Sequence, residues 1–449
     1  MVPYFANKAV TIYAGDCLQV LASLEPDSID AIVTDPPYGL GFMGKHWDSL
    51  PPGLPWAEEC LRVLKPGGHL LAFGGTRTWH RLMVAIEDAG FEIRDSIAWL
   101  YGSGFPKSRD VGKAIDSEAG AVREVIGQLN RLDQSVKPAH TFTYAGPMGA
   151  QVDALDITAP ATPEARKWQG WGTALKPAFE PIVVARKAIV GTVANNVLTH
   201  GTGAINIDGS RIGMSQSDRE KIDNMGGFGA AGWARADGTL RDSYDAAGRS
   251  GPLPAIDAKS HTAGRWPANV ILDETQATAL DEQSGTRTSS QPSPNGRYGE
   301  AVDTGGNVIL GKGLSSATPN QPPYGDTGGA SRFFYCAKAP KSERPVVNGK
   351  SHPTVKPLAL MRYLVKLVTP GGGTVLDTFA GSGATVEAAQ MEGFKAMAIE
   401  RDLEYVPMIL ARLVGKTATI LVPVVTPPKV RKARPVSPDQ IPLWEDTND

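Results

Sequence analysis

A short apolar strand that runs directly into two prolines is the feature that most restricts how this chain can fold. Residues 30–33 read Asp-Ala-Ile-Val, and residues 34–38 continue Thr-Asp-Pro-Pro-Tyr. The β-branched run predicts a buried strand, and proline fixes its own φ and restricts the residue before it. Asp35 and Pro36 should therefore be held rigidly just beyond the carboxyl end of the strand, where open α/β sheets bind their ligands.

The loop after this strand carries a carboxylate, a carbonyl and an aromatic ring that together suit one chemical task. The exocyclic amine of a nucleobase is a poor nucleophile, because its lone pair is delocalised into the ring. If the Asp35 carboxylate and the Pro36 carbonyl each accept one N–H, the nitrogen is held and its lone pair is aimed at an electrophile. Tyr38 could then stack on the base. The alternative is a surface turn with a solvated aspartate.

A second strand and turn, near the other end of the chain, have the same arrangement. Residues 374–377 predict a strand, Gly381 and Gly383 a tight turn, and residues 384–392 a helix that Gly393 ends. Glycines at such a turn let a ligand approach the backbone and the helix N-terminus closely. We interpret the two stretches as the two halves of one active site.

An acidic residue follows the glycine turn at the distance expected for a nucleotide ligand. Residues 395–399 predict a further strand that ends in Glu400, about 20 residues beyond the glycines, where a partner for a ribose hydroxyl is expected. A third glycine would complete a dinucleotide fingerprint, but that position is Val386, which argues against NAD or FAD. Taken alone, this stretch could also be an ordinary strand-to-helix turn.

Together these motifs resemble the amino-methylating DNA methyltransferases that use S-adenosylmethionine. The Asp-Pro-Pro-Tyr loop comes before the Phe-x-Gly-x-Gly loop at 379–383, which is the order of their β group. Gly15-Asp16 ahead of the first loop and His-Pro-Thr-Val-Lys-Pro at 352–357 ahead of the second support the match. The resemblance covers about residues 9–106 and 331–415 and, more loosely, 171–187.

The resemblance implies which residues act at the site, and it requires neither a metal nor a covalent enzyme intermediate. It assigns Asp16 to the adenine end of the cofactor, although this aspartate could instead cap the helix that follows it. The implied catalytic residues are Asp35, Pro36, Pro37 and Tyr38. The residues implied to bind S-adenosylmethionine are Asp16, Asp35, Lys356, Asp377, Phe379, Ala380, Gly381, Ser382, Gly383 and Glu400.

The implied fold is α/β, a Rossmann-like methyltransferase fold that is circularly permuted and carries an inserted target-recognition region. Strands alternate with helices along the first hundred residues, which predicts a mostly parallel sheet. We expect a catalytic half at 1–108, an insertion in the target-side loop at 109–170, a core strand within 171–190, the target-recognition region at 191–330, a cofactor-binding half at 331–424 and a flexible tail at 425–449.

The charge of the chain favours a DNA-binding surface that is local. The net charge of the 449 residues is −2, so the chain as a whole is not a basic nucleic-acid binder. One basic run could contact phosphates or form a solvated surface, and it consists of Arg332, Lys338, Lys341, Arg344, Lys350, Lys356, Arg362 and Lys366. The loop with Phe42, Lys45, His46 and Trp47 could close over an extruded base or be a plain surface loop. The loop at 101–108 resembles the target-side loop of the family, where an aromatic residue and a proline flank the flipped base.

Cysteine usage and hydropathy indicate the compartment. The three cysteines are isolated and form no pair at the spacing of a metal site or a redox motif. No apolar run approaches the roughly 18 residues that span a bilayer, and the N-terminus lacks the pattern of a secretory signal. We expect a reduced, cytoplasmic protein.

The resemblance implies methyl transfer from S-adenosylmethionine to the N6 amine of adenine in double-stranded DNA, after base flipping. Asp35 favours adenine because the cytosine enzymes of the family more often carry Ser at that position. Transfer to N4 of cytosine, or a catalytically silent DNA-binding protein on the same fold, are the alternatives, and an enzyme acting on RNA or on a protein amide is a weaker one. The resemblance also suggests a homodimer and a cognate restriction nuclease as partners. The recognition sequence cannot be read from the chain.

Overall fold

The computed structural model describes residues 1–40, 51–104, 108–128, 156–214, 216, 243–244, 250–251, 264–288, 327–337, 343, 345–347 and 349–414. Some of the sequence-based predictions concern residues outside these ranges. These are the loop with Phe42, Lys45, His46 and Trp47, the centre of the loop at 101–108, the basic residues Lys338, Lys341 and Arg344, and the tail at 425–449.

A ten-stranded sheet forms the body of the protein, with the strand order β1-β2-β18-β17-β3-β4-β8-β5-β11-β14. Within this sheet β1 and β8 run antiparallel to their neighbours, and the other pairs are parallel. In sheet order the strands are Phe5–Ala6, Val10–Ala14, Lys395–Glu400, Thr374–Asp377, Ile29–Thr34, Leu64–Phe73, Phe179–Arg186, Glu92–Leu100, Val270–Asp273 and Tyr335–Ala337.

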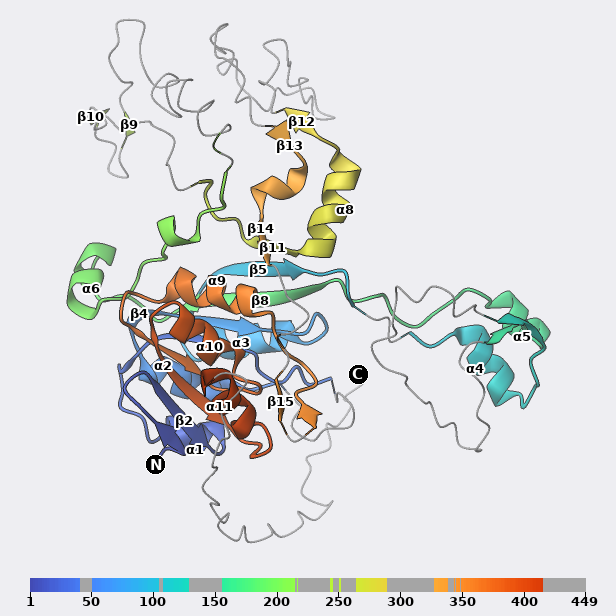
Figure 1. The fold of residues 1–449 in the computed structure, drawn as a ribbon, viewed down its shortest axis with the longest axis horizontal. Helices are drawn as coiled ribbons and strands as arrows, with labels where there is room; N and C mark the ends of the chain where they lie inside the picture. Colours follow the sequence, from blue (N-terminus) through green and yellow to red (C-terminus); the bar gives the residue numbers. More distant parts are fainter. Residues whose placement is uncertain are drawn as a thin grey trace, which may run out of the picture.

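The strands from the C-terminal part of the chain lie inside the N-terminal part of the sheet. β18 pairs with β2, and β17 pairs with β3, so the late strands separate two early ones (Figure 1). This order is the circular permutation expected from the sequence. The predicted Rossmann-like α/β fold class is confirmed.

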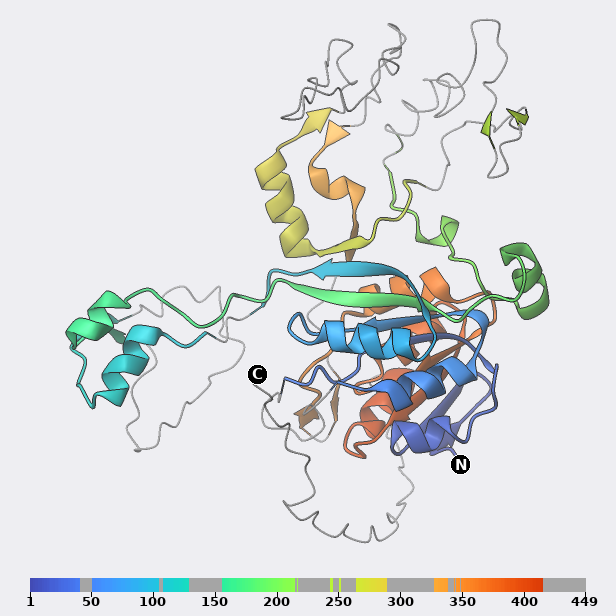
Figure 2. The ribbon, with the colours of Figure 1, turned by 180° about the vertical axis from the view of Figure 1, so that it is seen from behind.

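Helices cover both faces of the sheet. Along β4, Leu71 and Phe73 pack in a core with the helices α9 to α11, whereas Leu70 and Ala72 pack in a second core with α1 to α3. This alternation follows from the two-residue period of a strand and produces the three layers visible in Figures 1 and 2. The six helices are α1 (Cys17–Leu21), α2 (Leu54–Val63), α3 (Trp79–Asp88), α9 (Leu358–Val368), α10 (Ala384–Met391) and α11 (Val406–Val414).

A small unit lies beyond the ends of β5 and β8, away from the rest of the sheet (Figures 1 and 2). It contains α4 (Val111–Glu118), β6 (Val125–Gln128), β7 (Asp156–Thr158) and α5 (Pro163–Lys167). The buried Asp116 carboxylate holds it together by accepting hydrogen bonds from the Thr162 amide and hydroxyl and the Ala161 amide, and by pairing with Arg123. The unit occupies the segment predicted as an insertion.

The interval from 191 to 330 forms one strand of the main sheet and several elements outside that sheet. β11 pairs in parallel with β5 and with β14, so this part of the interval belongs to the core. The other described elements of the interval are α6 (Val193–His200), η3 (Asp208–Ser210), α8 (Glu274–Ser284) and the short strands β9 (Ser243–Tyr244), β10 (Ser250–Gly251), β12 (Arg287–Thr288) and β13 (Thr327–Gly328). At its end and after it come η4 (Ala330–Phe333), β15 (Val346–Val347) and β16 (Lys350–Ser351). Among the described residues no helix has the length and apolar character that crossing a bilayer requires.

Candidate active site

The carboxyl ends of β3 and β17 bring the two sequence motifs to the same point of the sheet. The strands are parallel neighbours, with Val375 opposite Ala31. Just beyond these residues the Thr34 hydroxyl donates to the Asp377 carboxylate, with 2.7 Å between Oγ1 and Oδ1. The loops that follow the two strands therefore start side by side, although they are far apart in the sequence.

Both loops line a single cavity of about 1300 Å³. Every residue that the sequence predicted for the site, except Gly383, lies in its wall. Gly383 instead has a φ of +81° at the start of α10, and a Cβ there would come within 2.9 Å of Ile409 Cγ2. It allows the turn and the packing of α11, and it does not face the cavity.

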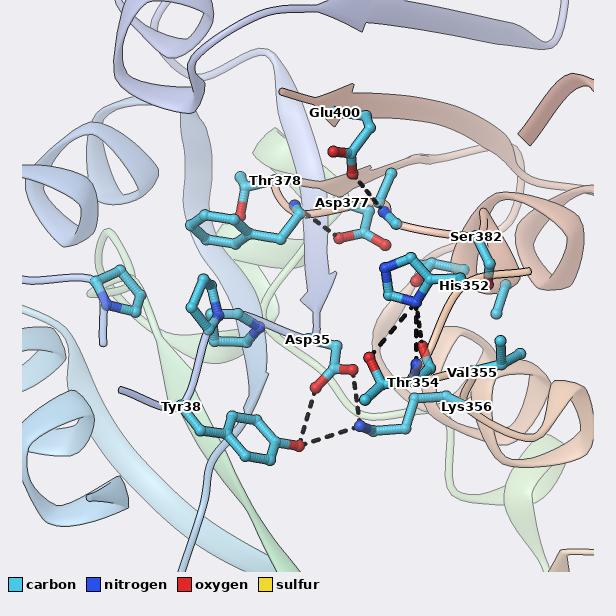
Figure 3. Close-up of a pocket in the computed structure, with 18 of the residues that line it drawn as sticks. Asp35, Tyr38, His352, Thr354, Val355, Lys356, Asp377, Thr378, Ser382 and Glu400 are labelled. Atoms are coloured by element: carbon cyan, nitrogen blue, oxygen red, sulfur yellow. Dashed lines mark hydrogen bonds and ion pairs between the residues drawn. The ribbon is translucent and has the colours of Figure 1, made fainter. Parts of the chain in front are cut away.

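In the first loop, Asp35 is held by a lysine and a tyrosine (Figure 3). Lys356 Nζ donates to Asp35 Oδ2 at 2.7 Å, and the Tyr38 hydroxyl lies 2.9 Å from Asp35 Oδ1. Glu180 Oε2 is 2.9 Å from the same hydroxyl and 3.2 Å from Lys356 Nζ. One ammonium and two carboxylates thus surround one phenol at the entrance of the proposed amine site.

Burial and charge set the protonation of this group of side chains. Burial acts to lower the pKa of Lys356, but the carboxylates of Asp35 and Glu180 outweigh it and raise this pKa above its usual value. Burial, followed by the same two carboxylates, raises the pKa of Tyr38 well above 10. At neutral pH Lys356 is therefore charged and Tyr38 keeps its hydroxyl proton.

Lys356 lies in the wall of the cavity, and the structure shows which protein groups its ammonium contacts. The resemblance assigned it to the cofactor, whereas its ammonium contacts Asp35, Tyr38 and Glu180. Its charge also lies 4.8 Å from the centre of the Phe73 ring. Lys356 therefore reaches the catalytic loop, and its assignment to the cofactor stays a prediction.

The glycine turn of the second loop is tied to the acid at the end of β18. The Gly381 amide donates to Glu400 Oε2 at 2.7 Å, and the Asp402 amide donates to Oε1 at 2.7 Å. Burial raises the pKa of Glu400 to about 7, although these two amides act to lower it. Gly381 has a φ of +49°, and a Cβ at this position would approach His352 Nε2 to 3.1 Å.

The buried Asp377 carboxylate stabilises the second loop through hydrogen bonds. It is 2% exposed and accepts hydrogen bonds from the Thr34 hydroxyl and from the Phe379 amide. Burial raises its pKa to about 6, while its hydrogen bonds act in the opposite direction. Its neighbour Thr378 accepts the Trp56 indole N–H at 3.1 Å. The carboxylate lines the cavity, but both of its roles in this structure concern loop geometry.

Asp16 caps a helix, one of the two interpretations that the sequence left open, and its contact with the cofactor stays a prediction. Its carboxylate accepts the Leu18 amide at 3.0 Å and caps α1. It also lies in the wall of the cavity, on the side of the second loop, and the adjacent Gly15 amide donates to the Glu400 carbonyl. A cap that faces the cavity can also meet a ligand.

Sequence reasoning missed three residues that support the two loops. Glu180 was assigned only to a core strand, yet its carboxylate contacts Tyr38. Thr78 donates to the Tyr38 carbonyl at 2.5 Å, and the Trp56 ring lies 5.9 Å from that of Phe379. An acid at the start of an otherwise apolar strand was the one available signal for Glu180, because such a position needs a partner.

Comparisons with known proteins agree with this arrangement. The family model N6_N4_Mtase, described as DNA methylase, matches residues 29–411. The type II methyltransferase M.HpaI of Haemophilus parainfluenzae is 34% identical over 109 residues, which are 22% of this chain and 34% of that protein. The type II methyltransferase M.HindIII of Haemophilus influenzae is 25% identical over 241 residues, which are 43% of this chain and 64% of that protein.

These relatives are matched over part of their length, about one third of M.HpaI and just under two thirds of M.HindIII. Among solved structures, one described as PvuII DNA methyltransferase (cytosine-N4-specific) has a TM-score of 0.40 and 13% sequence identity. That similarity covers 93% of this chain and 90% of the other. A score at this level supports no conclusion about the base on which the present chain acts.

Proposed function

The chain belongs to the N6_N4_Mtase family of DNA methylases, and we propose that it transfers a methyl group from S-adenosylmethionine to the N6 amine of adenine in double-stranded DNA. One observation carries this proposal. Two loops from opposite ends of the chain meet through the hydrogen bond between Thr34 and Asp377. Because of this contact, an amine-accepting loop and a nucleotide-type glycine turn line the same cavity.

The residues of the second loop fit S-adenosylmethionine. Glu400 lines the cavity, and each of its oxygens takes one backbone N–H, so each keeps acceptor capacity for a ribose hydroxyl. Gly381 has no Cβ where one would crowd His352, so the turn can lie close to this histidine in the cavity wall. Phe379 and Asp16 lie in the same wall and would border the adenine end.

The first loop would hold the target amine. Asp35 Oδ1 and the Pro36 carbonyl can each accept one N–H, which aims the nitrogen lone pair into the cavity. Lys356 orients the Asp35 carboxylate through its 2.7 Å contact. Tyr38, whose backbone carbonyl is fixed by Thr78, would stack on the extruded base.

When bound, S-adenosylmethionine supplies a methyl group on a sulfonium, and the sulfur keeps the bonding electron pair as the new carbon–nitrogen bond forms. The chain then contributes orientation and charge. The surplus proton on the methylated amine has an acceptor in Asp35, whose carboxylate is already directed at that nitrogen. Asp35 is also the residue that supports adenine over cytosine as the target.

The test is to incubate the protein with S-adenosylmethionine and unmethylated duplex DNA, digest the DNA to nucleosides, and identify the methylated nucleoside by mass spectrometry. N6-methyladenine is the expected product. N4-methylcytosine would keep the reaction and overturn the base assignment. If no product forms while the cofactor binds, the proposed activity on duplex DNA is wrong.

The role of Asp35 is tested with Asp35→Ala. This variant should abolish methyl transfer and leave cofactor affinity nearly unchanged, because Lys356 retains Glu180 as a counter-ion and the glycine turn is untouched. Asp88→Ala, at an exposed site at the end of α3, is the matched control and should keep activity. Loss of cofactor binding in Asp35→Ala would mean that Asp35 is structural.

A further inference from the structure

Glu180 occupies a position in the cavity that follows from the direction of its strand. β8 runs antiparallel to both β4 and β5, so its start lies at the edge where the parallel strands end. Glu180 is the second residue of β8 and lies opposite Trp99. Its side chain is 18% exposed, and its carboxylate contacts Tyr38 of the catalytic loop.

The Tyr38 hydroxyl lies between two acceptors at the same distance. Its oxygen is 2.9 Å from Asp35 Oδ1 and 2.9 Å from Glu180 Oε2, but a phenol has one proton to donate. Lys356 Nζ, 3.1 Å away, donates to the same phenol oxygen. The hydroxyl can therefore donate to either carboxylate by rotating about its C–O bond, without movement of any heavier atom.

These two orientations differ in what remains available on Asp35. When the hydroxyl donates to Asp35, an incoming amine has to share Oδ1 with it. When it donates to Glu180, Oδ1 is fully available for the amine, while Lys356 still holds Oδ2. A second acceptor for the phenol thus changes the strength of the hydrogen bond that orients the nucleophile.

We propose that Glu180 is a positioning residue that accepts the Tyr38 hydroxyl proton as a hydrogen bond when the target amine enters, and so frees Asp35 Oδ1 for the amine. The inference rests on the proposed function, because it concerns the same amine. It also assigns a function to an acid that would otherwise only add negative charge beside Asp35. The bond rearrangement involves no proton transfer, since the phenol keeps its proton in both orientations.

The test is a double-mutant cycle in methyl transfer, with Glu180→Leu and Tyr38→Phe singly and together. Glu180→Leu should lower kcat about tenfold with KM for DNA changed less than about threefold, since an interaction made at the reacting amine is being weakened. In the Tyr38→Phe background the same substitution should lower kcat less than about twofold, because residues that act through one contact are not additive.

Glu180→Gln distinguishes the acceptor from the charge. The amide oxygen of glutamine can still accept the hydrogen bond that the Tyr38 hydroxyl donates, so this variant should recover kcat to within about threefold of the wild type. If Glu180→Leu does not fold, Glu180→Ala takes its place in the cycle. Thermal melting and cofactor titration show which variants are folded.

The outcomes separate this inference from the proposed function. Equal losses from Glu180→Leu with and without the Tyr38 hydroxyl would overturn the inference alone, and so would a Glu180→Gln variant as impaired as Glu180→Leu, since charge would then be what matters. A folded wild-type protein that binds the cofactor and methylates no DNA would overturn both.

Discussion

The Thr34 hydroxyl donates to the Asp377 carboxylate at 2.7 Å across 343 positions of sequence. Both side chains are buried, and they lie at the ends of the neighbouring strands β3 and β17. The bond fixes the catalytic loop relative to the glycine turn at the point where both leave the sheet. Loss of the Thr34 donor would remove one of the hydrogen bonds that satisfy this buried carboxylate.

The first prediction concerns this bond. Thr34→Val keeps the shape of the side chain but removes the donor, and should lower the free energy of unfolding by about 1–3 kcal/mol. Urea denaturation measures the change. Thr199→Val, at an exposed site on α6, is the matched control and should change it by less than about 0.5 kcal/mol. Equal effects of the two substitutions would show that the hydrogen bond contributes nothing to the free energy of unfolding.

The sequence predicted the two loops and the elements around them, because their signals are local. Strand 374–377 has the predicted bounds, and the glycine turn lies between it and α10 as expected. The Pro66-Gly67-Gly68 stretch has the local composition of a connection between elements. β4 begins at Leu64 and runs through it, because neighbouring strands pair with both of its ends, as Leu64 does with Ile29.

The contacts that cross the sheet could not be predicted in the same way. Periodicity identifies β8 as a buried strand, but not that it runs antiparallel between β4 and β5. That direction is what brings Glu180 to Tyr38. Likewise, the motif around Lys356 predicted a residue at the cavity, whereas its contact with Asp35 depends on how the chain approaches α9.

The second prediction decides on which side of the cavity Lys356 acts. Lys356→Met should lower kcat for methyl transfer by about 100-fold or more, because the charge that orients Asp35 is lost. The dissociation constant of S-adenosylmethionine, measured by calorimetry, should change by less than about threefold, since Nζ contacts Asp35, Tyr38, Glu180 and the Phe73 ring.

A matched substitution controls for the loss of a lysine from the same region. Lys366 lies on α9, and its ammonium pairs with Glu392 at 3.0 Å. Lys366→Met removes this ammonium and should leave kcat unchanged. A large loss of cofactor affinity in Lys356→Met, with kcat retained, would restore the assignment that the family resemblance implied.

The third prediction concerns the glycine turn. Gly381→Ala places a Cβ on a residue with a φ of +49° and within 3.1 Å of His352 Nε2. The left-handed conformation alone should cost about 1–2 kcal/mol of stability, and displacement of the turn should weaken cofactor binding. Thermal melting and calorimetry measure the two effects. Gly371→Ala, whose Cβ would meet no atom within 4 Å, should be neutral in both measurements, and similar losses in the two variants would contradict the argument.

The last prediction follows from the pKa of Glu400, which burial raises to about 7. A ribose hydroxyl donates more strongly to a carboxylate than to a carboxylic acid, so cofactor affinity should rise as the pH increases from about 6 to about 8. In the apoprotein, the contribution of Glu400 to the free energy of unfolding should instead fall as the pH increases. A folded-state pKa above the unfolded value near 4.5 stabilises the fold fully below pH 4.5, and this contribution is lost as the pH rises through 7.

Calorimetric titration with S-adenosylmethionine at several pH values measures the first trend. Glu400→Gln carries no titrating group at this position, so it should bind the cofactor more weakly and with little dependence on pH over the same range. Glu87→Gln, at an exposed site on α3, should behave as the wild type. If the pH dependence persists in Glu400→Gln, it belongs to another group in the cavity wall, and Glu400 is then not the acid that meets the ribose.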